Sequence, residues 1–179
     1  MERSRISPSG KERTFSPDEL IVSKTDPKGR LTYVNDVFLA VSGYSEAEII
    51  GQPHSIIRHP EMPRCVFKLL WDTISSGHEL FAYVNNMAKT GDNYWVFAHV
   101  TPNFDTGGQI IGYHSNRRVP EPSALDKIKP LYRKLLEEEN RHADRKAGLD
   151  SSWRMLNQAV ADAGFDSYDR FVFAITPNS

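Results

Sequence analysis

Residues 79–118, ELFAYVNNMAKTGDNYWVFAHVTPNFDTGGQIIGYHSNRR, carry the main signal for the fold. This stretch contains three β-prone segments, at about 79–88, 93–103 and 109–118. The connectors between them, Lys89-Thr-Gly-Asp92 and Asp105-Thr-Gly-Gly108, carry the Gly and Asp residues that tight hairpin loops need. The stretch therefore predicts three consecutive antiparallel strands.

Two shorter β-prone runs lie closer to the N-terminus, at 19–25 and 30–34. They are joined by Asp26-Pro27-Lys28-Gly29, whose Pro and Gly suit a tight turn, so a hairpin is predicted here as well. Residues 1–17 are polar and have no periodic apolar pattern. We expect them to form a flexible N-terminal tail.

Short helical patterns lie between the two sets of strands. Residues 36–42 place apolar side chains on one helical face, and Gly43 can adopt the left-handed conformation that ends a helix. Ser45 and Glu48 have the spacing of a capping box. Three prolines in residues 52–63 prevent a long helix there, and a longer helix is predicted from Met62 to about Ser76.

This order of elements predicts an α+β fold over residues 18–119, with a five-stranded antiparallel sheet and short helices on one face. After Pro122 the chain becomes charged and helical, and we expect residues 120–179 to form a C-terminal helical extension. Pro130 is expected to kink the first helix or to mark a restart, and Asp150 is expected to cap a second one. The first helix carries one apolar stripe, which can cover the sheet or pair with a second copy: Leu125, Ile128, Leu131, Tyr132, Leu135 and Leu136.

Overall composition excludes several classes of protein. The 22 basic and 23 acidic residues nearly cancel, which argues against a nucleic-acid partner. A single cysteine, Cys65, rules out an intramolecular disulfide and fits a reducing compartment. No run approaches the roughly 20 apolar residues of a membrane span. We therefore expect a cytoplasmic protein without a membrane span.

Several strings go beyond the fold. They are Tyr33-Val-Asn-Asp-Val-Phe38, Val41-Ser-Gly-Tyr-Ser45, Gly51-Gln-Pro-His54, Arg58-His-Pro-Glu-Met-Pro63, Leu70-Trp71, Lys89-Thr-Gly-Asp-Asn-Tyr-Trp95 and Ile111-Gly-Tyr113. Together they resemble the FAD-binding PAS domain of bacterial aerotaxis receptors and, less closely, the flavin PAS domains of redox regulators such as NifL. In that family, aspartate is more common where Glu61 stands. A resemblance to light-sensing LOV domains would require an adduct-forming cysteine soon after Gly51, but His54 lies in the corresponding place.

The resemblance implies a flavin site with an asparagine on the strand before the Lys-Thr-Gly turn. Asn85 and Asn86 both lie there, and alternation along a strand places them on opposite faces. We favour Asn86, whose amide can donate and accept hydrogen bonds at once, and keep Asn85 as the second candidate. Trp71 and Trp95 are candidates for walls against the flavin ring. Either tryptophan can instead belong to the core.

The remaining candidates lie on loops. Arg58 has forked donors that suit a pyrophosphate or the ribityl oxygens, although a surface salt bridge is the alternative. His59 can bond the cofactor or brace its loop, and His54 can reach the ring edge or remain a simple loop histidine. Asn35 can bind the cofactor or cap the helix that follows it.

From these residues we expect a cytoplasmic FAD-binding sensor of redox state or oxygen that signals to a partner protein supplied in trans, or through a homodimer, and is not an enzyme. No membrane anchor or methyl-accepting module of the aerotaxis type is expected in this chain. FMN is a less favoured cofactor. The alternatives are a cofactor-free interaction module and a haem-binding gas sensor that uses a histidine such as His59 or His114.

Overall fold

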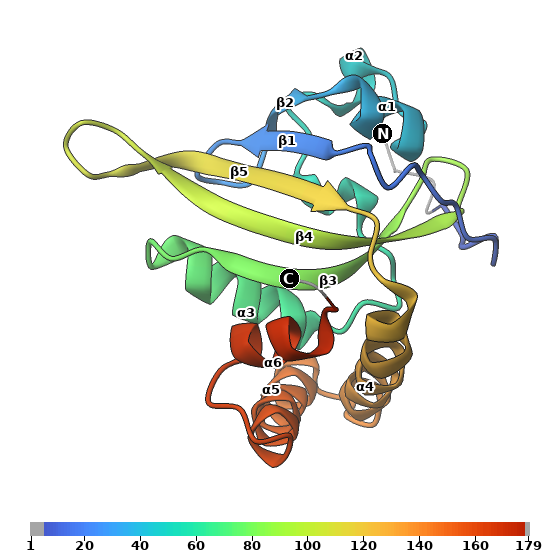
Figure 1. The fold of residues 1–179 in the computed structure, drawn as a ribbon, viewed down its shortest axis with the longest axis vertical. Helices are drawn as coiled ribbons and strands as arrows, with labels where there is room; N and C mark the ends of the chain where they lie inside the picture. Colours follow the sequence, from blue (N-terminus) through green and yellow to red (C-terminus); the bar gives the residue numbers. More distant parts are fainter. Residues whose placement is uncertain (1–5, 178–179) are drawn as a thin grey trace.

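The strands predicted from β-prone runs and their turn residues form one sheet in the computed structural model, which describes residues 6–177. All neighbouring strands are antiparallel, in the order β2-β1-β5-β4-β3. Figure 1 shows the long β4 and β5 at the centre of this sheet. The strands are β1 (Ile21–Thr25), β2 (Leu31–Val34), β3 (Leu80–Met87), β4 (Asn93–Phe104) and β5 (Ile110–Arg118). The predicted five-stranded antiparallel sheet is confirmed.

Short helices follow the first hairpin, as predicted. They are α1 (Asp36–Ser42), α2 (Glu46–Ile49), the 3-10 helix η1 (His54–Ile57) and α3 (Arg64–Ser75). Gly43 ends α1 in the left-handed region, with a φ of 73°. Ser45 and Glu48 form the capping box of α2. These local signals are confirmed because each depends only on residues that are neighbours in sequence.

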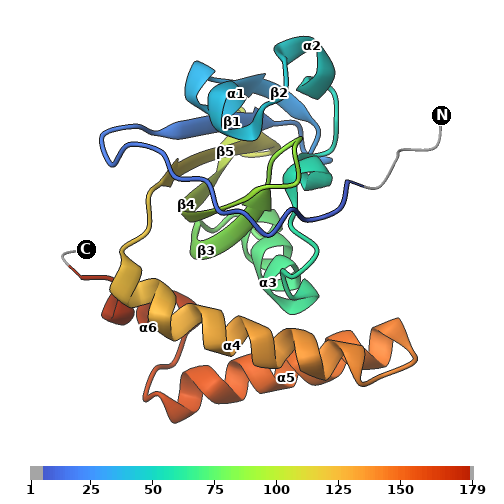
Figure 2. The same cartoon turned by 90° about the vertical axis from the view of Figure 1, so that its right-hand side faces the viewer.

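Three further helices form a separate layer beside the sheet (Figure 2). They are α4 (Pro122–Asn140), α5 (Arg145–Asp162) and α6 (Tyr168–Ile175). Pro130 lies inside α4, which continues through it as one helix. Helix α5 begins earlier than expected, because Asp144 rather than Asp150 caps it by accepting from the N–H groups of Lys146 and Ala147.

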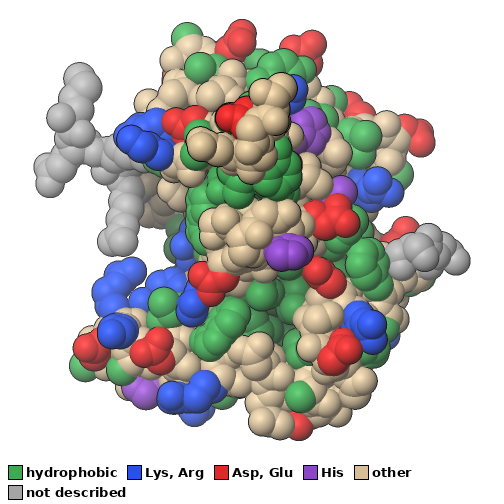
Figure 3. Space-filling model, turned by 90° about the vertical axis from the view of Figure 1, so that its left-hand side faces the viewer, with side chains coloured by type: hydrophobic (Ala, Val, Ile, Leu, Met, Phe, Trp, Pro, Cys, Tyr) green, Lys and Arg blue, Asp and Glu red, His purple; other side chains and the backbone are tan. Residues whose placement is uncertain are grey.

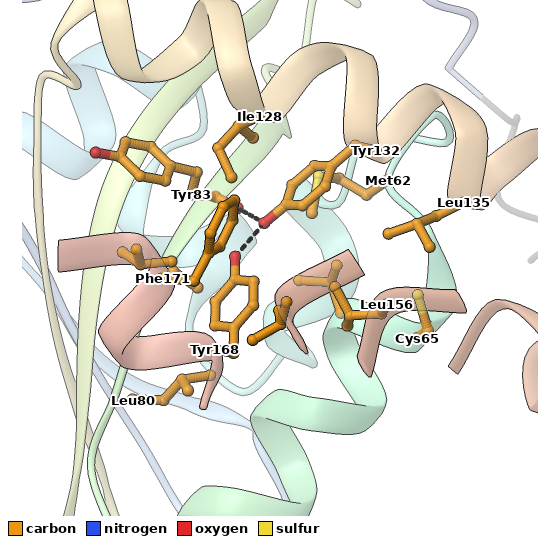
Figure 4. Close-up of a cluster of buried hydrophobic side chains, with 14 of the residues drawn as sticks. Met62, Cys65, Leu80, Tyr83, Ile128, Tyr132, Leu135, Leu156, Tyr168 and Phe171 are labelled. Carbon is orange, nitrogen blue, oxygen red and sulfur yellow. Dashed lines mark hydrogen bonds between the residues drawn. The ribbon is translucent and has the colours of Figure 1, made fainter. Parts of the chain in front are cut away.

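The apolar stripe of α4 is turned inward, toward the sheet and the other C-terminal helices. Ile128, Tyr132 and Leu135 are buried in one cluster with Leu156 of α5 and Phe171 of α6. At its centre the Tyr132 hydroxyl donates to the Tyr83 carbonyl oxygen at 2.8 Å and lies 2.6 Å from the Tyr168 hydroxyl (Figure 4). Of the two roles predicted for the stripe, it therefore covers the sheet.

Part of the N-terminal segment is held against the β3–β4 hairpin. Residues 11 and 13 exchange backbone hydrogen bonds with Asn93, and Arg13 forms an ion pair with Asp92 at 2.9 Å. Residues 9–13 thus make specific contacts that differ from the flexible tail expected over residues 1–17. Residues 1–5 of that tail lie outside the described residues. The boundary expected at residue 120 remains a prediction.

Among residues 6–177, no helix has both the length and the apolar character needed to cross a membrane.

Candidate functional site

A cavity of about 410 Å³ lies between one face of the sheet and α3. Strand register places Ala82, Val84, Ala98 and Val100 on this inner face. Helix α3 supplies the opposite wall, mainly through Phe67, Leu70 and Ile74. The volume falls within the roughly 300–1,000 Å³ of small-molecule sites, and its apolar walls suit a flat ring system.

A polar group lies at one side of this cavity. The Arg117 side chain donates from Nη2 to Ser23 Oγ at 2.5 Å and to His54 Nε2 at 2.6 Å. Because Nε2 accepts this bond, the proton of the neutral imidazole lies on Nδ1. Burial, reinforced by the Arg117 charge, lowers the pKa of His54 to about 3. Burial also lowers the pKa of Arg117, to about 10, so this residue is a cation at neutral pH whose partners here are uncharged.

Three buried polar atoms on the inner face have no hydrogen-bond partner within the described chain: Asn86 Nδ2, Ser115 Oγ and Arg117 Nη1. Ser115 and Arg117 line the cavity directly. Asn86 lies on the same face, two residues along β3 from Val84. Since an unpaired buried donor costs about 1–3 kcal/mol, these three atoms mark a place where a ligand with acceptor groups fits.

Arg58 and His59 lie close to β3, and an isolated β-bridge joins Arg58 to Asn86. Arg58 lines the cavity, and its guanidinium stacks over the Phe67 ring at 3.9 Å. His59 is buried and does not line the cavity; its Nδ1 accepts from the Glu61 N–H at 3.2 Å. That contact is the loop-bracing role named as an alternative for His59.

Trp71 lies at the mouth of the cavity, where its side chain lines the opening and remains 40% exposed. Its ring meets Tyr113 edge-on, with centroids 5.7 Å apart. On its other side lies Gly29, where a Cβ would approach the indole to 2.9 Å. The tryptophan thus lies at the entrance of the cavity and is not buried in the core.

Three further sequence candidates, besides His59, are not brought to the cavity. Asn35 caps α1, since its Oδ1 accepts from the Phe38 N–H at 3.0 Å. Asn85 and Trp95 pair with each other on the opposite face of the sheet. There the Asn85 Oδ1 accepts from Asn93, and Trp95 packs against Tyr132 with ring centroids 6.1 Å apart. Strand alternation therefore excludes both from the cavity wall.

The positions of the histidines and of the cysteine bear on haem binding, on thiol chemistry and on metal binding. Of the histidines in the described chain, only His54 lines the cavity, and its Nε2 is already bonded to Arg117. His114 lies on the outer face and contacts Asn116. Cys65 is buried away from the cavity lining, and burial raises the pKa of its thiol to about 12. Residues 6–177 contain no cluster of three or more His, Cys, Asp or Glu suited to a metal ion.

The sequence analysis missed Ser23, Ser115 and Arg117, which supply much of the polar lining. Polar residues at alternate strand positions usually face solvent, so alternation alone does not mark them. Only the pairing of β1 with β5, which places Ser23 opposite Ser115, brings them together.

The sheet order, the helices on its inner face and the enclosed cavity are those of a PAS domain. Residues 31–117 match the PAS fold family, and the chain carries a PAS domain.

The relatives include a receptor and a regulatory protein. The chain is 39% identical over 121 residues to the aerotaxis receptor of Escherichia coli, a match that covers 68% of this chain and 24% of that receptor. It is 27% identical over 97 residues to a nitrogen fixation regulatory protein of Klebsiella pneumoniae, covering 54% of this chain and 20% of the regulator. The chain thus spans about a quarter or less of these relatives.

Among solved structures, the dark state of the blue-light photoreceptor Aureochrome1 LOV is similar, with a TM-score of 0.52 and 26% identity. That match covers 68% of this chain and 84% of the LOV chain.

Proposed function

We propose that the chain is a flavin-binding sensor, with FAD as the cofactor, that reports redox state or oxygen in the cytoplasm to a partner protein. The observation that carries this proposal is the set of three unpaired buried donors beside a largely apolar cavity. An isoalloxazine ring needs flat apolar walls and a few converging polar groups, and this cavity offers both. The similarity to the aerotaxis receptor supports the same choice.

The charge of the lining adds to this support. Its charged side chains are all basic: Lys28, Arg58, Arg64, Lys68 and Arg117. No Asp or Glu is present among the described lining residues. A ligand with acceptor oxygens and negative charge therefore matches the site better than a neutral or cationic ligand.

A bound flavin would supply a ring whose charge and protonation change with its redox state. In this proposal Asn86 and Ser115 hydrogen-bond the polar parts of the cofactor, while the fixed charge of Arg117 favours the more negative redox form. Trp71 closes the mouth and limits the access of water. At neutral pH the positive charge on the polar side of the cavity comes from Arg117, because the neighbouring His54 is neutral.

We also propose that the chain signals without catalysing a reaction. The two relatives described above are named as a receptor and a regulatory protein. Helix α3 is suited to carry the signal, because one face lines the cavity and the other packs against α4 and α5.

The test is the visible spectrum of the purified full chain before and after incubation with FAD, FMN and riboflavin. We expect the two-band near-ultraviolet and blue absorption of a bound oxidised flavin, with slow or no turnover of NADH. Absence of these bands after incubation with all three flavins would overturn the proposal. A Soret band would instead support haem, and colourless protein that binds a partner would support a cofactor-free module.

A further inference from the structure

One side of the cavity mouth is built jointly by α3 and the C-terminal helices. Leu149 of α5 lines the cavity together with Arg58, Arg64 and Lys68. We call these four residues the basic rim, after the three cationic side chains among them. Figure 3 shows Lys and Arg side chains gathered on the left of this face of the molecule, next to apolar side chains.

Nearby carboxylates pair with two of the three cations of the basic rim and leave the third without an ionic partner among the described residues. Arg64 pairs with Glu139 at 3.0 Å, and Lys68 pairs with Asp72 at 2.5 Å. The guanidinium of Arg58 contacts only uncharged groups in the described chain, the Phe67 ring and the Met62 carbonyl oxygen.

Charges farther away act on the pKa of Arg58 in both directions. Burial lowers the pKa of Arg58, Glu139 opposes this effect, and the neighbouring charges of Arg64 and Arg145 lower it further. The basic rim is thus a partly exposed cationic edge on an apolar cavity.

We propose that the basic rim is the subsite for the phosphate groups of the cofactor, and that α5 of the C-terminal extension is part of that subsite. This inference rests on the proposed flavin function and deepens it. Arginine forks and a lysine suit phosphate oxygens, and a mouth that stays open to water suits the charged end of a ligand whose ring is enclosed.

The same side chains that face the cavity also hold α5 in place. Arg64 donates from Nη1 to the carbonyl oxygen of Arg145 at 2.8 Å, and the Lys68 ammonium lies 4.8 Å from the centre of the Trp153 ring. Arg64 and Lys68 therefore contact α5 and also line the cavity. Phosphate binding at the basic rim stabilises the docking of α5 on α3, because a ligand favours the state in which its site is complete.

The experiment measures dissociation constants of FAD, FMN and riboflavin for the full chain, by flavin fluorescence at low and high salt. We expect FAD to bind more tightly than FMN, and FMN more tightly than riboflavin. Salt should weaken only the two phosphate-bearing flavins.

Two substitutions locate the subsite. Lys68→Gln should weaken FAD about tenfold and leave riboflavin unchanged, while Lys134→Gln, an exposed lysine on α4, should change neither. Leu149→Ala should weaken FAD several-fold, whereas Leu131→Ala, a half-buried leucine of α4, should not. Hydrogen exchange of α5 amides should slow when FAD is added. Circular dichroism checks that each variant is folded.

Equal affinities for the three flavins, or equal effects of the rim and control substitutions, would overturn the subsite and leave the flavin function intact. Failure of the wild-type chain to bind any flavin would overturn both.

Discussion

The side-chain nitrogen of Asn86 is buried without a partner in the described chain, while the preceding residue on β3 is satisfied: Asn85 Oδ1 accepts from Asn93 Nδ2 at 3.1 Å on the opposite face. Two asparagines that are adjacent in sequence therefore have different energetic roles. Asn86 costs stability unless a ligand pairs with it, whereas Asn85 contributes stability in the chain itself.

Replacing each asparagine by leucine separates these roles. Asn86→Leu should leave the flavin-free protein as stable or more stable, because an unpaired buried amide is removed, and should weaken flavin binding at least tenfold. Asn85→Leu should cost about 1–2 kcal/mol of unfolding free energy, because Asn93 loses its acceptor, and leave flavin affinity unchanged. Urea unfolding and flavin titration measure the two effects. Similar results for both variants would contradict the assignment of faces.

His54 makes stability depend on pH. Its pKa falls from an ordinary value of 6.5, which the unfolded chain retains, to about 3 in the folded chain, so the unfolded chain takes up a proton that the folded chain does not. Stability is therefore fully present above pH 6.5 and is lost as pH falls from there toward 3, by up to about 1.4 kcal/mol per unit. His54→Gln keeps an acceptor for Arg117 and removes the titration.

Urea unfolding from pH 7 to pH 5 tests this expectation. Relative to its own value at pH 7, wild type should lose about 2 kcal/mol more than His54→Gln by pH 5. His59, whose pKa burial also lowers, is present in both proteins and cancels from the difference. Glu48 and Asp92 have folded pKa values of about 2 and affect stability mainly below this range. Parallel pH profiles would show that His54 is protonated in the folded protein.

For single residues, the sequence alone predicts features that depend on strand alternation, such as the face on which a side chain lies, and on local helix caps. Alternation predicts that only one of Asn85 and Asn86 faces inward, and the Asn35 cap was one of two named alternatives. Arg117 was not predicted, because its burial depends on β5 lying between β1 and β4 and on contact with His54 from a distant loop.

Among the elements, the α4–α5 pair shows how close packing overrides local preference. Gly148 lies inside α5, where glycine is a poor helix former. A Cβ at this position would approach the Glu139 carbonyl oxygen of α4 to 2.5 Å. The glycine therefore permits the two helices to approach each other. The sequence pattern predicted a later start for α5, with Asp150 as its cap.

Gly148→Ala should destabilise the protein by about 1–3 kcal/mol, although alanine is the better helix former, because the added methyl group forces the helices apart. Ala147→Gly, at the exposed neighbouring position, should cost no more than about 1 kcal/mol through helix propensity alone. Thermal or urea unfolding of both variants measures the costs. A stabilising effect of Gly148→Ala would mean that the helices can separate without loss.

Pro130 shows a second limit in predicting helices from the sequence. The helix is not interrupted at Pro130. Pro130 and Asp126, whose carbonyl lacks the usual N–H partner, are both exposed, so water can reach that carbonyl. A proline in a helical pattern predicts a lost hydrogen bond, but it does not predict on which side of the helix the loss falls.

For the whole molecule, the sheet has a different neighbour on each face. The inner face borders the cavity, and the outer face at β3 and β4 is covered by the C-terminal helices (Figure 2). Aromatic contacts form this cover: Phe81 meets Phe173 at 4.7 Å and Trp95 meets Tyr132 at 6.1 Å between ring centroids. The pairings of β1 with β2, β3 with β4 and β4 with β5 were predictable from their turns and spacing, whereas the pairing of β1 with β5 was not. The docking of α4–α6 was left open between two arrangements, because an apolar stripe does not reveal its partner.

A chain that ends at residue 120 should self-associate, because its outer face would expose Tyr83, Trp95 and Phe97 as one aromatic patch. Light scattering after size-exclusion chromatography measures this, with the full chain run beside it. The same truncation carrying Trp95→Thr and Phe97→Thr should associate less. A truncated chain that stays monomeric and binds flavin normally would show that the outer face needs no cover.

Strand β3 has cavity-facing and helix-facing side chains at alternate positions, so the two environments are separated by the thickness of one backbone. Val84 and Asn86 belong to one side, and Tyr83 and Asn85 to the other. Substitutions along these consecutive residues should therefore have effects that alternate with a period of two. Changes at cavity-facing positions should alter flavin binding, and changes at helix-facing positions should alter the contact between the sheet and the C-terminal helices. Each cavity-facing position on the strand thus has a helix-facing neighbour as its control, so the proposed ligand binding and the proposed signalling can be tested separately on one strand.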